Sequence, residues 1–281
     1  MIEKAGSVRT AGSVRRLVSA GLLAAIAAAV GLGPALASDA TCGSERATLS
    51  RPAALRSLAD RLAAKKPVRL LAIGSSSTEG VGASAPAKTY PARLEHDLRA
   101  TWANHKVEVV NAGIGGETAD QTLARLEQLM ADQARPALVL WQVGTNDALS
   151  GGDEARFRAL LERGIALVRA AGSDLVIVDQ QFFPRIADLG RYERYVAMVN
   201  AVAGEHGIPV FSRYKLMKLW AERDPALLNR MLSADGFHMG DLGYHCMADA
   251  LGRNVAESVE RTIRTRGVAA EPVAPVAQIR G

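Results

Sequence analysis

Cysteine and aromatic residues are scarce in this sequence of 281 residues: there are two cysteines, and aromatics make up 5% of the chain. Two cysteines are too few for a disulfide-rich scaffold. Only Cys246 has a potential metal-ligand neighbour, His245, and adjacent side chains seldom reach one ion, so we expect no metal site. Hydrophobic residues nevertheless make up 48% of the chain and charged residues 22%, which excludes a disordered or collagen-like protein and predicts a buried core.

Charged residues are absent from Leu17 to Ala37, a stretch composed mostly of Leu, Ala, Val and Gly. Residues 1–16 carry four basic side chains and one acidic side chain, and the uncharged stretch ends in an Ala-x-Ala pattern, Ala35-Leu36-Ala37. A basic segment, an apolar segment and small residues before a cleavage point are typical of a secretory signal peptide, which we assign to residues 1–37. The alternative is a retained membrane anchor, but Gly33-Pro34 and the Ala-x-Ala pattern favour cleavage.

Removal of residues 1–37 lowers the formal net charge from +5 to +2, because the signal peptide carries most of the excess of basic residues. A nearly neutral mature chain argues against nucleic-acid binding. We expect an exported protein, periplasmic or secreted, with no stable membrane insertion after cleavage. In an oxidising compartment Cys42 and Cys246 could form a disulfide across a loop of about 200 residues or remain two thiols, and the sequence favours neither.

Short apolar runs alternate with segments of helical periodicity, which predicts one α/β domain at 38–266, with a parallel sheet between two helical layers. A flexible tail rich in Pro and Ala is predicted at 267–281. The predicted strands are Val68–Ile73, Val107–Val110, Ala137–Val143, Leu175–Asp179 and Pro209–Phe211. The predicted helices are Pro52–Lys65, Tyr90–Ala103, Thr118–Asp132, Glu154–Ala171, Arg191–His206, Tyr214–Met231 and Gly243–Arg264.

Polar and glycine-rich segments follow the predicted strands, at the edge where open α/β sheets place their sites. They are Gly74-Ser75-Ser76, Asn111–Gly116 and Gly144-Thr145-Asn146-Asp147, with Asp235-Gly236-Phe237-His238 near the end of the chain. An acid three residues before a histidine can hold one imidazole nitrogen while the other faces a serine. A glycine amide and an asparagine side chain can stabilise the oxyanion that forms when that serine attacks.

These four segments, in this order, resemble those of the SGNH (GDSL-type) hydrolase family of serine esterases and lipases, and the resemblance covers about Val68 to Ala250. It implies that Ser76 is the nucleophile, with His238 as its base and Asp235 as the third member of the triad. Ser75 and Ser77 are chemical rivals of Ser76, and only the resemblance separates them.

The resemblance also implies an oxyanion hole formed by the Ser76 amide, the Gly116 amide and the Asn146 side chain. It implies a three-layer α/β/α sandwich whose five-stranded parallel sheet has the flavodoxin-like strand order. One departure is Ser75, which stands where the family usually has an aspartate that supports the loop. That replacement puts the rigidity of the loop and the rate in question more than the type of reaction.

The function that follows is an exported serine esterase, without cofactor or metal, that hydrolyses short-chain or acetyl esters of a small molecule or a polysaccharide. Three alternatives are an O-acetyltransferase that uses the same site, an inactive relative that binds glycans, and a flavin-binding module with Ser75–Thr78 as its phosphate loop. Aromatic residues near predicted strand ends could line an acyl or sugar pocket, although core packing explains Trp141 equally well. These residues are Trp141, Phe182, Phe183, Tyr192 and Tyr195.

Overall fold

The structure is a computed structural model that describes residue 42 and residues 49–131 and 135–270. The predicted signal peptide at 1–37 lies outside the described residues, as do residues 271–281 of the predicted tail. Within the described part of the chain, no helix is both long enough and apolar enough to cross a membrane.

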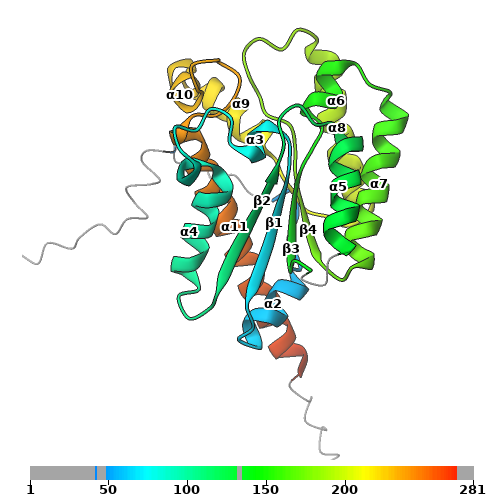
Figure 1. The fold of residues 1–281 in the computed structure, drawn as a ribbon, viewed down its shortest axis with the longest axis vertical. Coiled ribbons are helices and arrows are strands. Elements are labelled where there is room, and N and C mark those ends of the chain that lie inside the picture. The colour runs from blue at the N-terminus through cyan, green and yellow to red at the C-terminus, as the bar shows by residue number, and fades with distance from the viewer. Residues whose placement is uncertain (1–41, 43–48, 132–134, 271–281) are drawn as a thin grey trace, which may run out of the picture.

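The five predicted strands form one parallel sheet in the order β2-β1-β3-β4-β5, which confirms the three-layer fold and the flavodoxin-like strand order (Figure 1). The strands are rich in Val, Ile and Leu, as expected for strands that are covered on both faces. Their bounds are β1 Val68–Gly74, β2 Val107–Gly113, β3 Leu138–Gln142, β4 Asp174–Val178 and β5 Val210–Phe211.

Alternate residues of the strands pack into two separate hydrophobic cores, one on each face of the sheet. In β1, Leu70 and Ala72 belong to one core, whereas Leu71 and Ile73 belong to the other. Helices of the first core are α2 Arg56–Ala63, α4 Tyr90–Thr101, α9 Arg213–Arg223, α10 Pro225–Met231 and α11 Asp241–Ala270, and those of the second are α5 Ala119–Ala131, α7 Glu154–Ala170 and α8 Leu189–Glu205 (Figure 1).

Three short helical segments lie in the connections: α3 Ser76–Glu79, the 3₁₀ turn η1 Pro86–Lys88, and α6 Thr145–Ser150. Ser76 and Asn146 belong to the polar segments that follow β1 and β3, and each lies in the first turn of a short helix. Both helices follow the carboxyl end of a strand, so they present their first residues at the same edge of the sheet.

The single helix predicted over Tyr214–Met231 is wrong, because α9 and α10 are separate helices. Asp224 between them is extended, with φ −163° and ψ 112°, since the proline that follows disfavours the helical conformation. The Asp224 side chain accepts a hydrogen bond from the Ala226 amide at 2.9 Å and so caps α10. At the other end of the chain α11 continues through Ala270, so the first residues of the predicted tail, 267–270, are helical.

Cys42 and Cys246 form a disulfide, with their Cα atoms 5.3 Å apart, which decides between the two states that the sequence left open. The bond joins the start of the domain to α11. The indole of Trp220 donates a hydrogen bond to the carbonyl of Cys42 at 3.2 Å, so this cysteine is also fixed to α9.

Candidate active site

Ser76 is the first residue of α3, directly after the tight turn that ends β1. Gly74 in this turn has no room for a side chain, because a Cβ there would lie 2.6 Å from both the Gln142 amide oxygen and the Thr78 hydroxyl. The turn brings Ser76 to the carboxyl edge of the sheet, where it is partly exposed.

The three neighbouring serines have different partners, and only one of them contacts a histidine. The hydroxyl of Ser76 lies 2.9 Å from Nε2 of His238. The hydroxyl of Ser77 donates to Oε1 of Gln181 at 2.9 Å, and that of Ser75 to Oε1 of Gln142 at 3.2 Å. Ser75 and Ser77 are only 4% and 3% exposed. Their hydroxyls are buried and hydrogen-bonded, so they serve a structural role in the turn.

Asp235 holds the second imidazole nitrogen of His238, with Oδ2 2.6 Å from Nδ1. Its other oxygen, Oδ1, accepts hydrogen bonds from the amides of Phe237 and His238 at 2.8 and 2.9 Å and from the hydroxyl of Ser233 at 2.7 Å. One carboxylate oxygen therefore closes the turn, while the other orients the imidazole. The predicted Asp-x-x-His segment lies beside Ser76 as the spacing suggested.

Partial burial tends to raise the pKa of the Asp235 carboxyl, but its hydrogen bonds act in the opposite direction. Donors from the His238 side chain, the Ser233 hydroxyl and the amides of Phe237 and His238 together hold its pKa well below the usual range. The low pKa keeps Asp235 ionised near neutral pH, where it can stabilise a positive charge on His238.

Aromatic rings support the His238 loop from the side of the core. The ring of Phe237 packs edge-on against His238, with ring centroids 4.6 Å apart, and Phe183 packs against Phe237 at 4.7 Å. Gln181 completes the support, because its Nε2 donates to the Phe237 carbonyl at 3.0 Å. The position of His238 therefore depends on packing as well as on Asp235.

The expectation that aromatic residues line a substrate pocket is wrong for most of them. Trp141, Phe183 and Tyr192 are almost completely buried. The indole of Trp141 packs against Gly164, where a Cβ would lie 2.3 Å from the ring. Tyr195 is also buried, although it contributes to the lining of a surface cavity of about 340 Å³. Packing and support, not substrate contact, account for these rings.

Ser75, which stands where an aspartate is usual, is integrated into the turn through Gln142 at the end of β3. The amide oxygen of Gln142 accepts hydrogen bonds from the Ser75 amide at 2.9 Å, from the Ser75 hydroxyl, and from the Thr78 hydroxyl at 3.1 Å. The loop thus has a neutral support in place of a carboxylate. Gln142 is a supporting residue that was not predicted, although a glutamine at the end of the apolar run Leu138–Gln142 was a usable signal.

The glycine-rich segment after β2 passes close to Ser76. Gly113 packs directly against α3, since a Cβ there would lie 1.9 Å from the Glu79 amide nitrogen, and a Cβ on Gly115 would lie 3.9 Å from that of Ser76. Gly116 has φ +79°, a conformation that favours glycine. The predicted oxyanion glycine therefore lies in a loop that borders Ser76.

Asn146 is tied to this same loop, because its side-chain Nδ2 donates to the carbonyl of Glu117 at 2.7 Å. An amide NH₂ group has two hydrogens, so one remains for another acceptor. Asp147, its neighbour, accepts hydrogen bonds from the Ala119 amide at 3.0 and 3.1 Å. Burial raises the pKa of the Asp147 carboxyl despite these bonds. The structure thus joins Asn146 to the loop that contains Gly116 and borders Ser76.

The flavin alternative fits poorly with these contacts. A phosphate loop must leave its hydroxyls and amides free to face the ligand. The hydroxyls of Ser75, Ser77 and Thr78 are instead buried and hydrogen-bonded to Gln142, Gln181 or Tyr90. Among the residues that the structure describes, no group of three or more His, Cys, Asp or Glu side chains is arranged to hold a metal ion.

Comparisons with known proteins identify the family to which the chain is similar. The model of the non-GDSL lipase-like family matches residues 41–261. An arylesterase of Vibrio mimicus is 34% identical over 114 residues, which are 39% of this chain and 53% of that enzyme, so the match spans about half of that relative. The thioesterase 1/protease 1/lysophospholipase L1 of Escherichia coli (strain K12) is 32% identical over 167 residues, which cover 57% of this chain and 76% of that protein.

Among solved structures, a two-domain esterase active on acetylated mannans has the same fold, with a TM-score of 0.60 and 21% identity. The match covers 76% of this chain and 56% of that one. In keeping with the description of this family, the turn after β1 has Gly74-Ser75-Ser76 in place of Gly-Asp-Ser. The matched residues, the strand order and the relatives agree, and the chain belongs to the non-GDSL lipase-like family of SGNH-type carboxylic ester hydrolases.

Proposed function

We propose that this protein is an exported serine esterase that cleaves short-chain or acetyl esters with Ser76, His238 and Asp235 as its catalytic triad. The observation that carries the proposal is the continuous chain of contacts from Ser76 Oγ through both ring nitrogens of His238 to Asp235, at 2.9 and 2.6 Å. Both distances are within hydrogen-bond reach, as a nucleophile, its base and an orienting carboxylate require.

In the first half of the reaction, the hydroxyl proton of Ser76 passes to Nε2 of His238 while Oγ forms a bond to the ester carbonyl carbon. The ester C–O bond then breaks, and the alcohol leaves with the proton that His238 returns. In the second half, water gives a proton to His238, its oxygen attacks the acyl carbon, and the bond to Ser76 breaks to release the acid and restore the hydroxyl. Asp235 stabilises the imidazolium that forms in each half.

A negative charge develops on the carbonyl oxygen of the substrate during the attack. It needs hydrogen-bond donors on the side of Ser76 opposite His238. The amide of Ser76, the amide of Gly116 and the second hydrogen of the Asn146 amide are proposed for this role. Donors that are already oriented cost no reorganisation during the reaction, and the loss of one lowers kcat by about 10²–10³. The Asn146 contact with Glu117 supports this assignment, because it fixes the side chain before substrate binds.

We propose an ester with a small acyl group, such as acetate. The solved esterase that shares the fold is active on acetylated mannans, which makes acetylated polysaccharide a reasonable substrate class to test.

Hydrolysis of p-nitrophenyl esters of increasing acyl length tests the proposal. We expect activity on the acetate and butyrate esters, and loss of it in Ser76→Ala. Ser173→Ala, whose hydroxyl contacts the Pro136 carbonyl before β4, is the matched control and should keep full activity. Full activity in Ser76→Ala would overturn the triad, and activity on long acyl chains alone would overturn the short-ester preference. Acyl transfer to an added polysaccharide, in place of release to water, would identify the transferase alternative.

Export is supported by the charge and apolar pattern of residues 1–37 and by the disulfide between Cys42 and Cys246, since disulfides persist in oxidising compartments. Cell fractionation followed by amino-terminal sequencing tests this part. We expect a periplasmic or secreted protein that begins near Ser38. A protein that keeps residues 1–37 and sediments with the membrane would contradict cleavage.

A further inference from the structure

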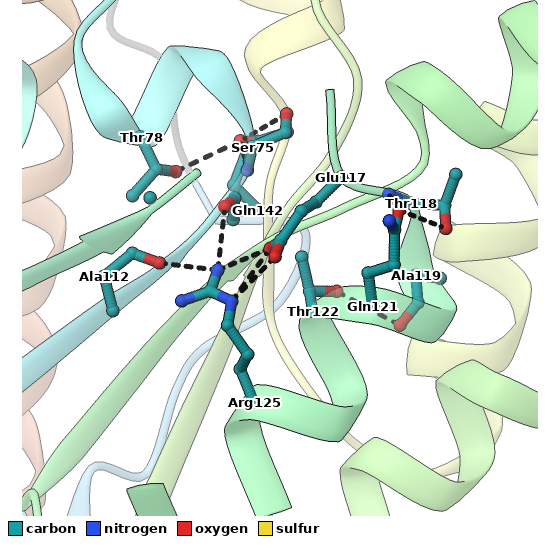
Figure 2. A network of polar contacts seen from close by, with 12 residues as sticks. Ser75, Thr78, Ala112, Glu117, Thr118, Ala119, Gln121, Thr122, Arg125 and Gln142 are labelled. Atoms are coloured by element: carbon teal, nitrogen blue, oxygen red, sulfur yellow. Dashed lines mark hydrogen bonds and ion pairs between the residues drawn. The ribbon is translucent and has the colours of Figure 1, made fainter. Parts of the chain in front are cut away.

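Glu117 and Arg125 form an ion pair beneath the loop that borders the nucleophile (Figure 2). Nε of Arg125 donates to Oε1 of Glu117 at 2.8 Å, and Nη2 donates to Oε2 at 2.5 Å. Their side chains are only 23% and 11% exposed, so the pair is shielded from solvent far more than an ordinary surface pair. Partial burial of two charges has a desolvation cost, so such a pair is weak evidence for added stability and calls for another explanation.

The same guanidinium also holds the ends of two strands. Nη2 of Arg125 donates to the carbonyl of Ala112, near the end of β2, at 2.9 Å, and makes a longer contact of 3.5 Å with the carbonyl of Gly74, the last residue of β1. Gly74 lies two residues before Ser76. The planar guanidinium has donors in a fixed arrangement, so it can hold these carbonyls and the carboxylate at the same time.

The backbone of Glu117 completes the connection, because its carbonyl accepts the hydrogen bond from the Asn146 side chain. Arg125 therefore fixes Glu117 through its side chain, and Glu117 fixes Asn146 through its main chain. Gly116 lies between the two, directly before Glu117 in the sequence. Asn146 thus contacts the pair directly, Gly116 is adjacent to Glu117 in the sequence, and Ser76 lies two residues after Gly74, whose carbonyl Arg125 contacts.

We propose that the Glu117–Arg125 ion pair positions the oxyanion hole by holding the ends of β1 and β2 and the Asn146 side chain in one arrangement. Arg125 and Glu117 are positioning residues, because neither is placed to contact the reacting atoms. The inference rests on the proposed function. It predicts that loss of the pair impairs stabilisation of the transition state while leaving substrate binding and the Ser76–His238–Asp235 triad intact.

The test compares kcat and KM of Arg125→Gln, Asn146→Ala and the double variant with those of the wild type. In Arg125→Gln we expect kcat to fall by about 10- to 100-fold while KM changes by less than about threefold. In the Asn146→Ala background the same substitution should lower kcat by a smaller factor than in the wild type, because the part of its effect that acts through Asn146 is already lost. A purely structural role would instead give two losses that multiply.

Two further variants keep the test decisive if a lone charge destabilises the protein. Glu117→Gln/Arg125→Gln leaves no unpaired charge and should show the same loss of kcat, and Arg125→Lys should retain part of the activity through its charge. Arg163→Gln is the matched control, because it breaks the solvent-exposed pair that Arg163 forms with Glu127 on α5. We expect that control to keep the activity of the wild type.

The wild type and Ser76→Ala are assayed together with these variants, so that the proposed esterase function and the positioning role of the ion pair can be tested separately. A wild type without esterase activity would overturn the proposed function and this inference with it. An active wild type whose Arg125→Gln and charge-neutral double variants retain full kcat, or whose losses multiply with that of Asn146→Ala, would overturn only the positioning role.

Discussion

At the scale of the residue, the contact between Ser75 and Gln142 supports the turn after β1 without a carboxylate. Ser75→Ala should cost only about 0.5–1.5 kcal/mol of unfolding free energy, because the Gln142 oxygen keeps its donors from the Ser75 amide and Thr78. Ser75→Asp should cost more, since it buries a carboxylate against an oxygen that only accepts hydrogen bonds. Urea unfolding of both variants checks the order, and a more stable Ser75→Asp protein would contradict it.

Asp235 has two tasks, which the structure divides between its two carboxylate oxygens. Asp235→Asn keeps the size of the side chain but can favour the wrong tautomer of His238, so kcat should fall by about 10⁴. Ser233→Ala removes only one of the donors to Oδ1 and should lower kcat far less. Steady-state kinetics on p-nitrophenyl acetate measures both, and equal effects would argue that the carboxylate acts only by closing the turn.

The low pKa of Asp235 also has a consequence for stability. Its folded-state pKa is depressed, so its contribution to stability is present above the unfolded-state pKa of about 4 and is lost as the pH falls below that value. Acid unfolding of Asp235→Asn should therefore depend less on pH below about 4 than that of the wild type. Parallel acid-unfolding curves for the two proteins would argue against this contribution.

At the scale of the element, the close approach of β2 to α3 depends on Gly113. In Gly113→Ala the new Cβ would meet the backbone of α3. We therefore expect the free energy of unfolding to fall by about 3 kcal/mol or more and the esterase activity to fall by about 10²-fold. Gly172→Ala is the control, because open space surrounds that residue and only its φ of +72° is strained, at about 1–2 kcal/mol. Thermal unfolding and the ester assay measure the two effects, and equal effects would refute the contact argument.

The strands could be predicted from the sequence because each is an almost continuous apolar run. Their spatial order could not be derived from the runs themselves and followed only from the family resemblance. The break at Asp224-Pro225 was signalled by a residue before proline that cannot easily stay helical, but helical periodicity on both sides obscured it. Local patterns therefore predicted the elements better than their boundaries.

The site was predictable only in part, for a related reason. Ser76, Asp235 and His238 belong to short local motifs, which a sequence displays directly. Glu117 and Arg125 are eight residues apart and meet only because the loop before α5 folds back over that helix, so no periodicity indicates the pair. The aromatic residues near strand ends were misinterpreted, since nearness to the catalytic edge in sequence does not distinguish a buried ring from an exposed one.

At the scale of the whole molecule, the disulfide between Cys42 and Cys246 connects positions 204 residues apart and joins the start of the domain to α11. Reduction should lower the unfolding free energy by about 2–5 kcal/mol while leaving esterase activity at 25 °C in place, because Ser76 and His238 do not depend on the bond. Thermal unfolding with and without reductant measures the change. The stability of Cys42→Ser/Cys246→Ser should match that of the reduced protein and should not change with reductant. A wild type whose stability is equally unchanged by reductant would contradict the role of the bond.

Two hydrophobic cores pack on opposite faces of one parallel sheet, and four polar segments lie at a single edge of it. We propose that these segments form one nucleophilic site. Labelling with a fluorophosphonate, followed by peptide mass spectrometry, tests that claim most directly. We predict a single adduct, located on Ser76 and absent from Ser75 and Ser77, whose formation is abolished in His238→Ala. An adduct on a different residue, or labelling of Ser76 that is unchanged in His238→Ala, would contradict the account.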